Sequence, residues 1–115
     1  MQLLTLGRDP AITAAFLAQL EVARPGMYNA YTAHSPVEFR ELAEAHKAEI
    51  DLVLLGAAQN DEQAKVARSI VEEVFGSEMR VIRLPGSLLT EEGKRGGMLA
   101  WFLQELEEGQ SINQK

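Results

Sequence analysis

A run of four apolar residues, from Leu52 to Leu55, most constrains what this chain can fold into. A strand with one face in water alternates apolar and polar side chains, whereas a strand covered on both faces does not need to alternate. Gly56 ends the run, and the polar segment after it is typical of a helix start. We therefore predict that residues 50–56 form the central strand of a parallel sheet with helices on both faces.

Strand and helix signals alternate along the rest of the chain. Short apolar segments at residues 2–6, 27–33 and 79–84 predict three further strands. Asp9-Pro10 and Ser35-Pro36 each place an N-cap residue before a proline at the first helical position. Because a glutamate follows Ser35 three residues later, we also predict a capping box at residues 35–38.

Apolar residues at helical spacing predict four helices. We expect them at residues 10–24, 36–46, 61–75 and 98–108, with Gly109 ending the last one. The predicted core positions of the third helix are Val66, Ala67, Ile70, Val71 and Val74. Those of the fourth helix are Leu99, Phe102, Leu103 and Leu106.

This alternation predicts the fold class. Strands joined by helices form βαβ units with parallel pairing and right-handed crossovers. We predict one three-layer α/β/α domain over residues 1–109, with a doubly wound parallel four-stranded sheet in the flavodoxin-like order 2-1-3-4. Residues 27–33 are the least apolar strand and are expected at an edge, and residues 110–115 are expected to be a polar tail.

Composition excludes several classes of function. The net charge of −6 argues against nucleic-acid binding, which needs a basic surface, and against binding to an anionic membrane. The chain has no cysteine, so disulfides and thiolate chemistry are excluded. No apolar run approaches the roughly 20 residues of a membrane-spanning helix, and the N-terminal residues lack a signal-peptide pattern. We expect a cytoplasmic protein.

Three stretches resemble the receiver domains of two-component response regulators. Residues 6–12 (Leu-Gly-Arg-Asp-Pro-Ala-Ile) lie where receivers have the first strand, an acidic pair and the first helix start. Residues 50–56 are similar to the receiver stretch that ends in the phospho-accepting aspartate. Residues 83–85 (Arg-Leu-Pro) are similar to the Lys-Pro after the last strand of a receiver. The resemblance implies a flavodoxin-like fold and a role in signalling.

The residues that receivers use for phosphotransfer are replaced here. Gly56 stands where the resemblance places the phospho-accepting aspartate, and Asp9 is the one carboxylate where receivers hold Mg²⁺. A single carboxylate beside Arg8 is insufficient, because Mg²⁺ takes several oxygen ligands. Arg83 or Leu84 stands where receivers have the lysine, and a receiver has five strands rather than four. We therefore expect a non-catalytic, unphosphorylated receiver-like domain without a metal or a cofactor.

A small-ligand site is the alternative that the sequence leaves open. In an open α/β sheet, ligands bind beyond the carboxyl ends of the strands. The residues expected at that edge are Arg8, Asp9, His34, Gly56, Asn60 and Ser87. They could bind an anion or a nucleotide, with helix N-termini adding positive charge. They could equally be ordinary turn and capping residues, and neither a GxGxxG nor a GxxxxGK[ST] motif is present.

The last predicted helix suggests a partner surface. Trp101 lies nearly opposite the stripe expected to face the sheet and close to Met98. Trp and Met are enriched at protein interfaces, although Trp101 could instead pack sideways against a neighbouring helix. The preferred hypothesis is a domain that acts by protein–protein contact, as a homodimer through Met98 and Trp101.

Overall fold

The computed structural model describes the backbone of residues 1–113 and the side chains of residues 1–107. Its sheet has four parallel strands, β1 (Gln2–Leu6), β2 (Asn29–Ala33), β3 (Leu52–Leu55) and β4 (Val81–Arg83). The strand order is β2-β1-β3-β4. The predicted parallel sheet, its order and the edge position of β2 are confirmed. All four residues of β3 are buried, as a strand covered on both faces requires.

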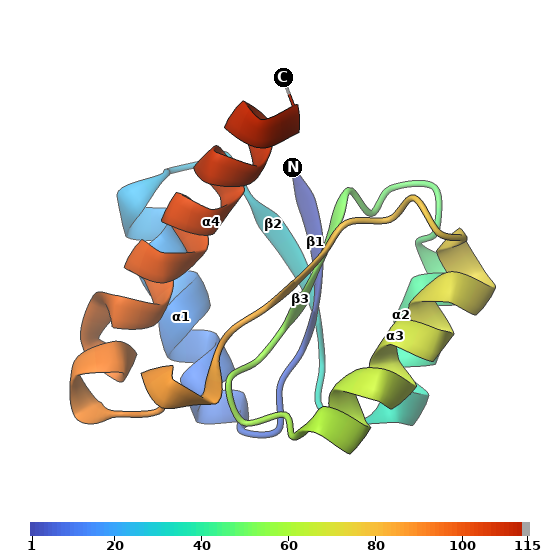
Figure 1. Cartoon of the computed structure of the whole chain (residues 1–115), viewed down its shortest axis with the longest axis horizontal. Coiled ribbons are helices and arrows are strands. Elements are labelled where there is room, and N and C mark those ends of the chain that lie inside the picture. Colours follow the sequence, from blue (N-terminus) through green and yellow to red (C-terminus); the bar gives the residue numbers. More distant parts are fainter. Residues whose placement is uncertain (114–115) are drawn as a thin grey trace.

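Helices cover both faces of this sheet. Helices α1 (Pro10–Ala23) and α4 (Met98–Asn113) lie on one face, and α2 (Pro36–Ala45) and α3 (Asp61–Phe75) lie on the other (Figure 1). This is the predicted three-layer, flavodoxin-like arrangement. Among the described residues, no helix is both long enough and apolar enough to cross a membrane.

Each strand divides its side chains between two apolar cores, one on each face of the sheet. Leu52 and Leu54 pack with α1 and α4, whereas Val53 and Leu55 pack with α2 and α3. This division explains the unbroken run in β3, because successive side chains point to opposite faces and both faces are dry. The core under α1 and α4 is centred on Phe102, which is fully buried.

Two of the predicted N-caps form as expected, and the predicted capping box does not. Asp9 Oδ1 accepts a hydrogen bond from Ala11 N at 2.9 Å, and Ser35 Oγ accepts one from Glu38 N at 3.2 Å. The carboxylate of Glu38, however, accepts from His34 N at 3.1 Å rather than from the N-cap residue. The predicted capping box at residues 35–38 is therefore wrong, because the Glu38 carboxylate accepts from the N–H of the residue before the N-cap and not from the N-cap N–H itself.

The C-terminal helix differs most from the prediction. Helix α4 continues to Asn113, so its predicted end at Gly109 and the start of a polar tail at residue 110 are wrong, and residues 114–115 lie outside the described part. One glycine costs a helix about 1 kcal/mol, which is too little to end it. Val66, predicted in the core of α3, is 47% exposed, because it lies at the margin of the stripe that Ala67, Ile70 and Val74 form.

The segment before α4 is an irregular turn. Residues 86–88 form a short 3₁₀ turn, and residues 93–97 form a wide, π-type turn in which Gly96 has φ 140°. We call residues 93–97 the Gly93–Gly97 turn. The prediction that the regular helix begins near Met98 is confirmed.

Candidate functional site

The carboxyl ends of β1 and β3 lie in direct backbone contact. Gly56 N donates to Leu6 O at 2.8 Å. A Cβ atom added to Gly56 would lie 3.3 Å from Gly7 Cα, and one added to Gly7 would lie 2.4 Å from Thr13 Oγ1. Both glycines therefore lie in tightly packed positions. The cavity behind them measures about 30 Å³, close to the volume of one water molecule, which is far too small for a nucleotide.

Arg8 and Asp9 do not form a joint binding group. Arg8 is exposed, and none of the described residues pairs with it. Asp9 serves as the N-cap of α1, and its backbone carbonyl also accepts from Thr13 Oγ1 at 3.2 Å. The prediction that Asp9 acts as an N-cap is thus confirmed. Nowhere in the described part of the chain do three His, Asp or Glu side chains gather in a group that could hold a metal ion.

His34 lies at the carboxyl end of β2. The residue is half-buried, and its Nε2 atom is buried without a hydrogen-bond partner. No carboxylate in the described residues contacts the imidazole, so it lacks the orienting partner that a general base in a triad uses. The contacts of His34 therefore do not resemble those of a catalytic base.

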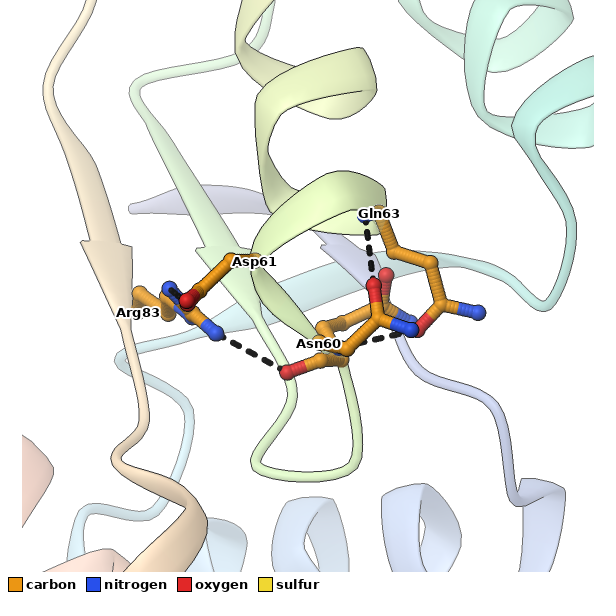
Figure 2. Close-up of polar contacts among 5 residues, drawn as sticks. Asn60, Asp61, Gln63 and Arg83 are labelled. Atoms are coloured by element: carbon orange, nitrogen blue, oxygen red, sulfur yellow. Dashed lines mark hydrogen bonds and ion pairs between the residues drawn. The ribbon is translucent and has the colours of Figure 1, made fainter.

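Asn60 and the residues around it form a closed polar cluster at the start of α3. Asn60 Oδ1 accepts from Gln63 N at 2.8 Å, and Gln63 Oε1 accepts from Asn60 N at 2.9 Å, which completes a capping box (Figure 2). Arg83 donates to Gln59 O and to Asp61 Oδ1, both at 3.0 Å. Arg83 therefore fastens β4 to the loop after β3 and is not available to an incoming phosphoryl group.

The residues predicted at this edge therefore have separate structural roles and do not form one binding site. Gly56 packs against backbone, Asn60 caps a helix and Ser87 is an exposed residue of the 3₁₀ turn. Sequence reasoning missed the link from Arg83 to residues 59–61, since it joins segments more than 20 residues apart and leaves no local pattern. The signal for the Asn60 cap was present in the sequence.

The predicted interface residues on α4 face inward. Met98 is 2% exposed and belongs to the core beneath α1 and α4, so its assignment to a partner surface is wrong. Trp101 is half-buried and packs against the same core. The buried stripe of α4 consists of Met98, Phe102 and Leu106, which are four residues apart. The helix is therefore rotated about its axis relative to the orientation that the predicted stripe requires.

Helix α1 has an outward side with almost no charge. Glu21 is the one charged residue in its 14 positions. Its inward side buries Phe16 and Leu20. Its outward side exposes small or apolar residues, and we call these the α1 face: Ala11, Ala14, Ala15, Ala18 and Val22. A helix that is apolar on all sides is typically covered on all sides.

Two hollows lie along the flank of α1 that faces the Gly93–Gly97 turn. The first measures about 290 Å³ and is lined by Ile12, Phe16 and Met98, among others. The second lies beside Val22 and Leu99 and is more open. Gln19 Nε2 donates to Lys94 O at 2.8 Å and separates the two.

Comparisons with family models, with curated proteins and with solved structures find no match for this chain.

Proposed function

We propose that this chain is a non-catalytic, receiver-like domain that acts by protein–protein contact and forms a homodimer through the α1 face. Its strand ends are closed by Gly7 and Gly56 and carry no phospho-accepting carboxylate. Without a nucleophile or a metal-binding group at that edge, the function of the fold is to present a surface that binds another protein chain. The single observation that carries the proposal is the uncharged α1 face.

The exposed fraction of Val22 makes this face unusual. Val22 is 82% exposed, the highest value among the large apolar side chains that the structure describes. It lies on the same side of α1 as four exposed alanines. Scattered exposed apolar residues are ordinary, but a continuous apolar helix side is a feature of interaction surfaces.

Charge favours a second copy of the same chain as the occupant. Two copies with a net charge of −6 each repel one another over most of their surfaces. The α1 face reduces this repulsion, because its own residues are uncharged. Of the charged side chains that line its hollows, Lys94 and Arg95 are positive, and only Asp9, at one end, is negative. In an antiparallel pairing about a two-fold axis, Val22 of each copy lies opposite Ala11 of the other. The alanines permit close approach of the two helices, at about 8 Å between axes.

Sedimentation of two matched variants tests the proposal. Val22→Asp places a charge within the contact, opposite Ala11 of the other copy, whereas Val37→Asp makes the same change on α2, where the valine is 68% exposed. We expect wild type and Val37→Asp to sediment as dimers and Val22→Asp to sediment as a monomer. A monomeric wild type, or a dimer that survives in Val22→Asp, would contradict the assignment of the contact to α1.

A further inference from the structure

We propose that the hollow beside α1 binds a small, uncharged, mainly apolar molecule with one hydroxyl group, such as a phenol. Thr5 lies in the middle of β1. Its side chain is 3% exposed, and its Oγ1 atom has no hydrogen-bond partner among the protein atoms. A buried hydroxyl that has lost its hydration is unfavourable unless another group bonds to it, so a ligand hydroxyl beside Thr5 would be stabilised by that bond.

Thr5 lines the inner cavity of about 30 Å³, on the α1 and α4 side of the sheet. Ile12, Phe16 and Met98 line both this cavity and the larger hollow of about 290 Å³. These three side chains are all that the two spaces share. Methionine has three rotatable bonds and adapts its shape readily. A change of the Met98 rotamer would therefore connect the two spaces.

The sizes of the two spaces define the chemistry of the ligand. The inner cavity is about the size of a water molecule and therefore accepts one hydroxyl group. A dry cavity of about 150 Å³ is large enough to bind benzene. The outer hollow exceeds this volume and accommodates a substituted ring. Since a threonine hydroxyl both donates and accepts, a phenolic or alcoholic hydroxyl satisfies it in either direction.

A charged head group does not suit the inner cavity. Its other lining residues are apolar side chains or glycines, apart from Thr13, whose hydroxyl already bonds to Asp9 O. A carboxylate or an ammonium group placed there would lose its hydration without a counter-charge, which is prohibitively costly. Asp9 and Lys94 are the charged residues that line the outer hollow, and both are exposed to solvent.

Phenol and toluene form a matched pair of probes, because they have nearly the same shape and differ in the hydroxyl. In thermal-shift titrations of the whole chain, phenol should raise Tm more than toluene does. Thr5→Val removes the hydroxyl and keeps the side-chain shape, so it should weaken phenol binding by about fivefold and make the two probes equivalent. Thr32→Val is the control: it makes the same change on the adjacent strand, where Thr32 pairs in register with Thr5 outside the cavity.

A second pair of variants tests the outer hollow. Ala15 lines it, whereas Ala45 is exposed on α2 and lies outside both the hollow and the α1 face. Ala15→Trp should fill the hollow and abolish both shifts, and Ala45→Trp should keep them. Equal shifts by phenol and toluene in wild type, or a phenol preference that survives Thr5→Val, would overturn the proposal. Val22→Asp should retain the phenol preference, so a failure of the homodimer and a failure of this site are distinguishable.

Discussion

At the scale of single residues, Tyr31, His46 and Glu49 form a polar group at the end of α2. The rings of Tyr31 and His46 stack at 3.8 Å between centroids. Glu49 Oε2 accepts from the Tyr31 hydroxyl at 2.7 Å and lies 3.3 Å from His46 Nδ1. The hydrogen bond to Glu49 raises the pKa of Tyr31 above its ordinary value of 10.0, since losing the proton breaks the bond and brings two negative charges together.

The ionisation of Tyr31 provides a residue-scale prediction. Because its folded pKa is raised, the bond to Glu49 stabilises the fold fully below pH 10, and this contribution disappears as the pH rises through the folded pKa. The difference in phenolate absorbance between wild type and Tyr31→Phe should give a midpoint above 10. In Glu49→Ala the midpoint should return towards 10, and a wild-type midpoint at or below 10 would show that the bond is not formed.

At the scale of elements, the Gly93–Gly97 turn determines how α4 lies on the sheet. Gly93 N donates to Thr90 Oγ1 at 2.9 Å, and Gly93 itself is buried. A Cβ atom added to Gly93 would lie 1.8 Å from Leu88 O, which is a backbone atom that cannot easily move. At Gly97 the nearest atom would lie 3.4 Å away, which is ordinary contact.

These two glycines give an element-scale prediction. Gly93→Ala forces the turn apart and should destabilise the protein by roughly 1–3 kcal/mol, the usual cost of overpacking. Gly97→Ala should be neutral or should stabilise it by up to about 1 kcal/mol, because alanine favours the helix. Urea unfolding of both variants measures the difference. Equal unfolding midpoints would mean that the contact between Gly93 and Leu88 does not constrain the turn.

Elements determined by local chemistry were predictable from the sequence. The apolar run of β3 and the N-cap signals before α1, α2 and α3 placed the sheet and the helix starts correctly. The rotation of α4 was not predictable, because the helix follows an irregular turn in which Gly96 has φ 140°, and no local sequence pattern specifies such a turn. Met98 was therefore assigned to the surface and lies in the core.

The candidate sites were harder to predict because they depend on packing between distant segments. The hydroxyl of Thr5 has no partner only because α1 and α4 close over it. The α1 face, in contrast, has a signal in the sequence, since one charged residue in 14 is unusual for a surface helix.

At the scale of the whole molecule, the net charge and the α1 face act in opposite directions on self-association. The charge of −6 on each copy disfavours a dimer, and burial of Val22 and the alanines favours it. Salt screens the first effect strongly, since the Debye length falls from about 8 Å at 0.15 M to about 3 Å at 1 M. Salt does not weaken the apolar contact.

The dimer should therefore become tighter as salt is added, which is the reverse of an ionic contact. Because association stabilises the folded chain by mass action, Tm should also rise with protein concentration. Scanning calorimetry at several protein and salt concentrations measures both effects, and Val22→Asp should remove the dependence on concentration. Dissociation on adding salt would show that the copies meet through ion pairs, and hence through a surface other than the α1 face.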